Sequence, residues 1–245
     1  MNIVIMGAGG VGGYFGAKLA NAGNKVSFIA RGKHLEAIKN NGLKIISETG
    51  DILIHPANAT DNPEELEIAD IILFCVKAYD TEASAKLIKP IVGPKTAVIP
   101  FLNGLGHIEI MKNILGNNNV IGGVAAISAL IEEPGIIRHN SPMQMLKFGE
   151  FSNEKTERVI AFQSACEKAG INNAIPDNIN TDMWQKIVMI CTLAGANCIT
   201  RLPLGKCRSN PATRILMKNL AEEVVAVAKA EKISLPDNQV EMTMK

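Results

Sequence analysis

The sequence predicts an α/β fold followed by an all-helical segment, and three observations lead to this fold class. Near the N-terminus an apolar stretch, a glycine-rich turn and an apolar helical pattern follow one another directly. Further apolar stretches then alternate with helical patterns, which is typical of a parallel sheet covered by helices on both faces. Beyond Pro176 almost every stretch has the pattern of a helix. We therefore expect two domains, residues 1–176 and 177–245.

Asn2 to Met6 is predicted to be the first strand, because four of its five residues are apolar and the stretch stops at a glycine. Gly7, Gly9 and Gly12 follow with the spacing G-x-G-x-x-G, and a mostly apolar helix is predicted from Val11 onward. This order is typical of a Rossmann-type doubly wound sheet, in which the loop and the helix N-terminus bind the pyrophosphate of a dinucleotide. A purely structural glycine turn is the alternative. The residues of the predicted cofactor loop are Gly7, Ala8, Gly9, Gly10, Val11 and Gly12.

The second predicted strand, Lys25 to Ala30, ends in a basic sequence that bears on the choice of cofactor. An NAD site usually has Asp or Glu at this point to bind the ribose 2′-hydroxyl, whereas this sequence has Arg31-Gly-Lys33. Arg31 can hold a 2′-phosphate through charge-assisted hydrogen bonds and can stack on adenine. We therefore expect NADPH, with a solvated charged loop as the alternative.

The alternation of predicted strands and helices continues through the middle of the chain. A continuous apolar run predicts a buried parallel strand at Asp70 to Val76. The other predicted elements are a helix at His34 to Asn41, a small antiparallel hairpin insertion at Leu43 to Ser47 and Ile52 to His55, a helix at Thr81 to Ile88, a strand at Thr96 to Phe101 and a helix at Ile108 to Leu115.

Two polar residues follow predicted strands, at the sheet edge where ligands of open α/β sheets bind. Lys77 comes directly after Val76, and it either faces the cofactor or substrate or is a plain surface lysine. Asn103 follows Leu102 and stands beside Gly104. Its amide can donate and accept hydrogen bonds to a substrate carbonyl or a nicotinamide, but an Asn-Gly turn explains it equally well.

The last third of the chain carries a lysine inside an apolar helix. Asp182 to Ala194 is apolar on nearly all faces except at Gln185 and Lys186, so we expect this helix to be buried and Lys186 to be a functional candidate. A lysine that extends its amine to water is the alternative. The remaining predicted elements are strands at Val120 to Leu130, Ile136 to His139, Met145 to Phe148 and Ile171 to Ile175, and helices at Lys155 to Ala169 and Ala212 to Lys232.

Composition excludes several classes of partner. The 25 basic and 24 acidic residues nearly cancel, so we expect small-molecule partners and no binding to nucleic acid or to a membrane surface. No apolar run reaches the length of a membrane span and no signal peptide precedes the first strand, so we expect a cytoplasmic protein. The five cysteines lack a close C-x-x-C pair and are expected to be buried thiols, and the four histidines lack metal-ligand spacing, so no metal site is predicted.

Taken together, these stretches closely resemble the ketopantoate reductase family, whose members are also called 2-dehydropantoate 2-reductases. The matching motifs follow the family's order along nearly the whole chain: GAGGVGGYFG, ARGKHLEAI, CVKAYDT, LNGLG, GGVAAISALIEEPGIIRH, FGE, MWQK and GANCITRLPLG. The resemblance implies an N-terminal Rossmann domain, an all-helical C-terminal domain and catalysis in the cleft between them. It also implies NADPH-dependent reduction of 2-dehydropantoate to pantoate, a step toward pantothenate and coenzyme A.

The resemblance also implies roles for individual residues. It assigns the pyrophosphate loop to Gly7, Gly9 and Gly12, the 2′-phosphate contact to Arg31, the nicotinamide and substrate cleft to Lys77 and Asn103, and the catalytic, substrate-contacting lysine to Lys186.

This sequence departs from the family in two places. Some members carry asparagines four and eight residues after the catalytic lysine, where this sequence has Ile190 and Ala194. Members usually continue into a serine and acidic segment that helps to bind the keto acid, whereas this sequence stops at Lys245, so we expect a truncated helical domain. A non-catalytic NADPH-binding protein and a related reductase of another 2-keto acid therefore stay open as alternatives. A homodimer is one option for the oligomeric state.

Overall fold

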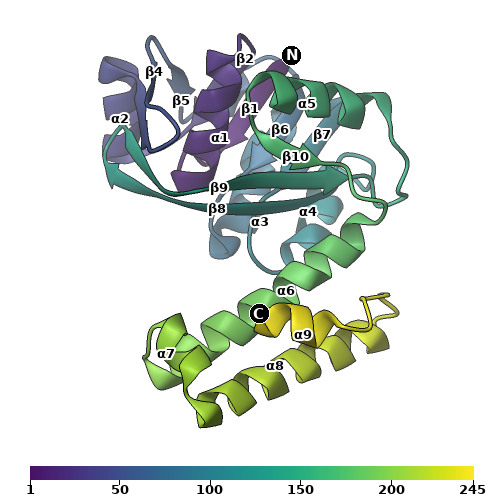
Figure 1. Cartoon of the computed structure of the whole chain (residues 1–245). Coiled ribbons are helices and arrows are strands. Elements are labelled where there is room, and N and C mark those ends of the chain that lie inside the picture. The colour runs from purple at the N-terminus through teal and green to yellow at the C-terminus, as the bar shows by residue number, and fades with distance from the viewer. The chain divides into compact units, whose positions relative to one another are not determined.

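The chain forms two compact units, Met1–Ile179 and Asn180–Lys245, in a computed structural model that describes all residues 1–245 (Figure 1). The boundary that we predict from the sequence lies between residues 176 and 177, close to this one. The first unit contains two β-sheets and the second contains helices alone. None of the helices combines the length and the apolar content that crossing a membrane requires.

A five-stranded parallel sheet forms the centre of the first unit, with the strand order β5-β2-β1-β6-β7. Its strands are β1 (Asn2–Met6), β2 (Lys25–Ile29), β5 (Asn58–Thr60), β6 (Ala69–Phe74) and β7 (Val92–Pro100). The helices of this unit are α1 (Gly10–Asn21), α2 (Gly32–Asn41), α3 (Thr81–Ile88), α4 (His107–Leu115) and α5 (Glu157–Lys168), with short 3-10 helices η1 (Pro63–Glu65), η2 (Ala78–Asp80) and η3 (Lys89–Ile91).

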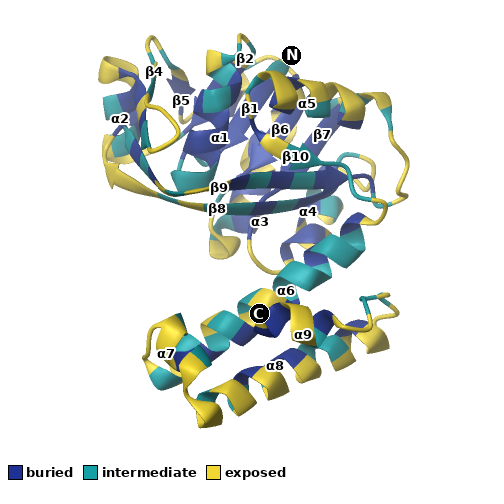
Figure 2. Ribbon diagram, viewed as in Figure 1, coloured by how far each residue is buried: buried dark blue, intermediate teal, exposed yellow.

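Helices cover both faces of this sheet, as the two neighbouring residues Val4 and Ile5 of β1 show. Ile5 belongs to the core cluster that contains Phe15 of α1. Val4 belongs to the second cluster, which contains Met111 of α4. Neighbouring side chains of a strand point to opposite faces, so the sheet is packed on both sides. Figure 2 shows the resulting buried residues along these strands. The predicted doubly wound α/β fold is confirmed.

A second five-stranded sheet is wider than the hairpin that we predict from the sequence. It runs β10-β9-β3-β4, with β8 paired to β9. Its strands are β3 (Leu43–Ser47), β4 (Ile52–Ile54), β8 (Gly122–Glu133), β9 (Ile136–Gly149) and β10 (Asn172–Ala174). The strands β3 and β4 are antiparallel as predicted, but β3 also pairs with β9 in parallel, so the hairpin is part of this larger sheet.

The prediction of two separate strands at Ile136 to His139 and Met145 to Phe148 is wrong, because both lie in the single strand β9. The polar sequence around Pro142 interrupts the apolar alternation and therefore imitates a turn. The pairing register with β8 shifts between Ile127 and Ala129. Such an irregularity lets a strand continue past a proline that cannot donate to the ladder.

The second unit consists mainly of four helices: α6 (Ile179–Thr200), α7 (Leu204–Ser209), α8 (Pro211–Ala230) and α9 (Gln239–Met244). The first residue of α6, Ile179, is the last residue of the first unit. The side chain of Asn210 caps α8 by accepting hydrogen bonds from the N–H groups of Ala212 and Thr213. A small core cluster joins the four helices through Ala196, Cys207, Met217 and Met244.

The expectation that the apolar helix Asp182 to Ala194 is buried is wrong for one of its sides. Met189 is 41% exposed, and Ala194 is exposed as well. In this small unit the other helices cover only one side of α6, as the mixture of buried and exposed residues along it shows (Figure 2). For the same reason Cys191 and Cys198 are exposed free thiols, contrary to the prediction that the cysteines are buried.

Candidate functional site

Most of the predicted site residues lie at the carboxyl edge of the parallel sheet. Arg31 follows β2, Gly7 follows β1, Lys77 follows β6 and Asn103 follows β7. The chain leaves β1 toward β2 and β5 on one side and later returns to β6 and β7 on the other. The switch point between β1 and β6 is where open α/β sheets bind their ligands.

Gly7 and Gly12 allow the backbone to pack closely at this switch point. Gly7 has a φ of +96°, and a Cβ there would lie 3.1 Å from the backbone carbonyl of Cys75. A Cβ on Gly12 would collide with the carbonyl oxygen of Gly7 and would lie 2.8 Å from Cγ2 of Ile5. Both positions therefore require glycine, because any larger residue would push α1 away from β1 or distort the turn.

Gly9 is different, because its Cα borders open space. No atom lies within 4 Å of the position that a Cβ of Gly9 would take. Gly9 is also the N-cap of α1, so the N–H groups of Gly10, Val11 and Gly12 are among those that the helix's own ladder leaves unpaired. Free space and N–H donors at the positive end of a helix fit the pyrophosphate of a dinucleotide.

Gly10 has a structural role that the sequence pattern does not reveal. A Cβ on Gly10 would collide with the carbonyl oxygen of Ala129 in β8. A Cβ on Gly13 would lie 2.9 Å from Cγ1 of Ile137 in β9. These glycines let the second sheet lie close against the start of α1, and no ligand is needed to explain them.

Arg31 is exposed and forms an ion pair at the sheet edge. Its guanidinium Nη2 lies 3.1 Å from Oδ2 of Asp80, and its side chain is 85% exposed. Asp80 ends η2, which follows Lys77 directly. The sequence analysis did not predict Asp80 as a site residue, although Asp80 lies only three residues after the predicted site residue Lys77.

Lys77 and Asn103 lie at the ends of adjacent strands, and both are exposed. Lys77 is the N-cap of η2. Gly104, directly after Asn103, has a φ of +97°, and the chain bends at residues 103–105. The bend leaves Asn103 at the carboxyl edge of β7, so the structural and the binding interpretations are compatible.

His34 is a further residue at this edge that sequence reasoning considered only as a metal ligand. Its Nε2 lies 2.8 Å from the carbonyl oxygen of Ala8 in the cofactor loop. Its Nδ1 accepts the N–H of Gly135, at 3.0 Å, from the turn between β8 and β9.

No three His, Cys, Asp or Glu side chains lie close enough together to hold a metal ion.

Lys186 lies in the second unit, on α6, and is half-buried. Burial disfavours the charged amine and lowers the pKa of Lys186 to about 8. Ile190 is half-buried and Ala194 is exposed, one and two helical turns further along α6. Apolar side chains therefore stand where some family members have asparagines.

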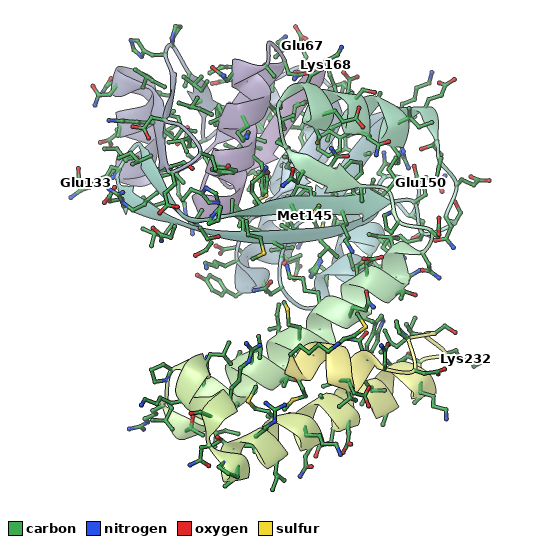
Figure 3. All side chains as sticks on the ribbon, viewed as in Figure 1. Glu67, Glu133, Met145, Glu150, Lys168 and Lys232 are labelled. Carbon is green, nitrogen blue, oxygen red and sulfur yellow. The ribbon has the colours of Figure 1, made fainter.

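A cavity of about 510 Å³ in the first unit involves none of the predicted site residues. It is lined by the ion pair of Glu150 and Arg158, whose bonded atoms lie 2.8 Å apart. Burial raises the pKa of Glu150, but the hydrogen bonds from Arg158 and Thr156 outweigh it and leave this pKa lowered. Arg158 also donates to the carbonyl oxygen of Thr96 in β7, so the pair joins the end of β9 to the parallel sheet. Figure 3 shows Glu150 at this end of β9. We interpret the pair as structural.

The fold and the glycine loop at the switch point define the class, a Rossmann-type protein built to bind a dinucleotide. Two family models match the chain: ketopantoate reductase PanE/ApbA over residues 3–153, and the C-terminal model of the same family over residues 178–245. The chain therefore belongs to the ketopantoate reductase family and is an NAD(P)-dependent oxidoreductase by family.

Curated relatives and a solved structure agree with this assignment. The chain is 32% identical over 233 residues to the uncharacterized oxidoreductase YkpB of Bacillus subtilis, covering 95% of this chain and 76% of the relative. It is 31% identical over 257 residues to a 2-dehydropantoate 2-reductase of Mesorhizobium japonicum, covering 96% and 78%. The crystal structure of 2-dehydropantoate 2-reductase from Porphyromonas gingivalis superposes with a TM-score of 0.93 at 34% identity, covering 100% of this chain and 87% of that one.

Proposed function

We propose that the protein reduces the 2-keto acid 2-dehydropantoate to pantoate, a precursor of pantothenate, and that it uses NADPH. The observation that carries this proposal is the half-buried Lys186, whose pKa is lowered to about 8 by burial. The sequence resemblance assigns the role of the family's catalytic lysine to this residue. The lowered pKa brings the amine close to the range in which a general acid works near neutral pH.

The carboxyl edge of the parallel sheet supports the choice of cofactor. Gly9 and the start of α1 offer room and N–H groups for the pyrophosphate. Arg31 offers a guanidinium group for the 2′-phosphate, and β2 ends without the carboxylate that an NAD site usually has. Lys77 and Asn103 stand on the other side of the switch point, where the nicotinamide and the keto acid would lie.

The reaction needs one proton from the protein. Bound NADPH would supply the hydride that adds to the ketone carbon. Negative charge then develops on the ketone oxygen, which requires a donor within hydrogen-bond reach. In our proposal the ammonium group of Lys186 gives its proton to this oxygen and becomes a neutral amine. The amide of Asn103 holds the ketone oxygen or the cofactor's carboxamide in the orientation that the transfer requires.

The test is the loss of NADPH absorbance with 2-dehydropantoate, measured beside pyruvate and 2-ketoisovalerate and beside a binding titration of NADPH. We expect turnover with 2-dehydropantoate to exceed turnover with the other two acids. Tight NADPH binding without any turnover would instead favour a non-catalytic NADPH-binding protein.

A related reductase of another 2-keto acid is the second candidate, and the residues after Lys186 favour it. Ile190 and Ala194 cannot form the hydrogen bonds of the asparagines that some members have there. A less polar keto acid would lose less binding affinity when apolar side chains replace these asparagines. Faster turnover with 2-ketoisovalerate than with 2-dehydropantoate would support this candidate.

A further inference from the structure

We propose that His34 is a positioning residue for the cofactor loop, holding the peptide between Ala8 and Gly9 so that the Gly9 N–H can bind the cofactor's pyrophosphate. This inference rests on the proposed use of a dinucleotide. It concerns a residue that neither the glycine pattern nor the family resemblance assigns to the site.

Backbone hydrogen bonds hold the loop on both sides of the carbonyl of Ala8, whereas this carbonyl itself is held by a side chain. The N–H groups of Gly7 and Ala8 both donate to the carbonyl oxygen of Ile29, at 3.2 Å each. The carbonyl oxygen of Gly9 accepts the N–H of Gly13 at 2.6 Å and starts the helix. Between these anchors, the carbonyl of Ala8 is held by Nε2 of His34.

The bond to the carbonyl of Ala8 also sets the direction of the next N–H. The carbonyl of Ala8 and the N–H of Gly9 belong to one planar trans peptide, in which they point in opposite directions. Because His34 holds the carbonyl, the N–H of Gly9 is aimed to the side of the loop away from His34. Gly9 also borders the open space at the start of α1. A donor that is already oriented does not lose rotational freedom when the anion binds.

The turn between β8 and β9 holds His34 in the tautomer that this role requires. The N–H of Gly135 donates to Nδ1, so Nδ1 has no proton in this arrangement and Nε2 carries the one given to Ala8. The turn itself is packed on α2, since a Cβ on Gly135 would lie 3.1 Å from Cβ of Ala37, and the carbonyl of Gly135 accepts the N–H of Lys44 at 2.9 Å. Figure 3 shows Glu133 at this end of the β8–β9 hairpin.

The position of His34 on α2 links the two halves of the predicted cofactor site. Arg31 is the N-cap of α2, and His34 lies in the first turn of the same helix. Arg31 would hold the adenosine 2′-phosphate, while His34 acts on the loop that would hold the pyrophosphate. Ligands that carry only one of these groups can therefore separate the two roles.

The experiment compares His34→Phe, which keeps a ring but no hydrogen bonds, with His34→Gln, whose amide N–H can donate to Ala8. The probes are NADPH, ADP-ribose, which has the pyrophosphate, and 2′-AMP, which lacks it. We expect His34→Phe to weaken NADPH and ADP-ribose by about three- to tenfold, the worth of one hydrogen bond, and to leave 2′-AMP within about twofold. His34→Gln should recover most of the affinity. The KM for 2-dehydropantoate and kcat at saturating NADPH should change by less than about twofold.

Three outcomes would overturn the inference. Unchanged ADP-ribose binding in His34→Phe would show that the loop does not need His34, while the proposed function would stand if the parent still reduces 2-dehydropantoate. Equal losses for ADP-ribose and 2′-AMP would indicate general damage to the unit. A parent that binds neither NADPH nor NADH would remove the proposed function and this inference together.

A measurement on the parent protein keeps the inference testable if the variants do not fold. Nitrogen NMR of the histidine rings, assigned through the backbone, reports the tautomer of His34 directly. We expect a neutral ring with the proton on Nε2, and a change in its Nε2 signal when ADP-ribose is added. A proton on Nδ1, or no response to ADP-ribose, would contradict the role.

Discussion

The cofactor loop after β1 and the helix α6 are both candidate parts of one reaction, but they are built in opposite ways. In the loop, side chains are absent where the backbone must come close, at Gly7 and Gly12, and where space is left open, at Gly9. In α6, a single long side chain is partly removed from water, and its burial lowers the pKa of Lys186 to about 8. The loop therefore acts through geometry, and α6 acts through a shifted acidity.

This difference predicts different responses to substitution. A backbone donor cannot be removed by changing one side chain, so variants around the loop should alter cofactor affinity by modest factors. A proton donor is one group, so its loss should alter the rate and leave binding nearly unchanged.

Lys186→Ala should give the largest effect. We expect kcat for 2-dehydropantoate to fall by about 10²–10⁴-fold, the usual contribution of a positioned acid, because no group remains to protonate the ketone oxygen. NADPH affinity should stay nearly unchanged, because the residues that we propose for the cofactor stay in place. Steady-state kinetics and an NADPH titration measure these effects.

Lys218→Ala is the matched control for this variant, because Lys218 lies in the same unit on α8 and forms only an exposed pair with Glu222. It should keep the parent's kcat. If Lys186→Ala also kept most of its turnover, the catalytic role would be refuted and Lys77 would become the next candidate donor.

Arg31→Ala should give an intermediate effect on binding. We expect NADPH to bind more weakly by about 1.5–3 kcal/mol, the worth of a hydrogen bond to a charged group, while NADH hardly changes. Titrations of both cofactors measure this difference. Lys39→Ala, an exposed lysine on α2, serves as the control. Equal losses for NADPH and NADH would show that Arg31 does not contact the 2′-phosphate.

Asp80→Asn should give a smaller effect of opposite sign. The carboxylate of Asp80 pairs with Arg31 in the structure and would repel a 2′-phosphate at the same place. Removing its charge should therefore strengthen NADPH binding by about 0.2–1 kcal/mol, the range for an exposed ion pair, and leave NADH nearly unchanged. Weaker NADPH binding in this variant would mean that Asp80 orients Arg31 for the phosphate.

The sequence predicts the loop better than it predicts α6, for a physical reason. Strand, glycine spacing and helix follow one another in the chain, so the loop's geometry is encoded locally. The burial of α6 depends on which neighbours cover it, and we wrongly predict that Asp182 to Ala194 is buried, although Met189 and Ala194 are exposed. The apolar composition of a helix alone does not tell whether neighbours surround the helix or cover only one of its sides.

The residues that sequence reasoning missed at the site are those with distant partners. His34 meets Gly135, which lies 101 residues further along the chain, and Arg31 meets Asp80, which lies 49 residues further. Neither spacing corresponds to a local motif. The sequence also does not predict the strand β5, because Asn58–Thr60 is too short and too polar a stretch to show a strand pattern.

The acidity of Lys186 is the central claim, and the pH dependence of a single turnover tests it most directly. The donor is the protonated amine, whose fraction falls as pH rises through about 8. With saturating NADPH and 2-dehydropantoate, the rate of NADPH consumption should therefore be constant at low pH and fall about tenfold per unit of pH above this value. A rate that stays constant up to about pH 10, near the pKa of an unperturbed lysine, would contradict the account.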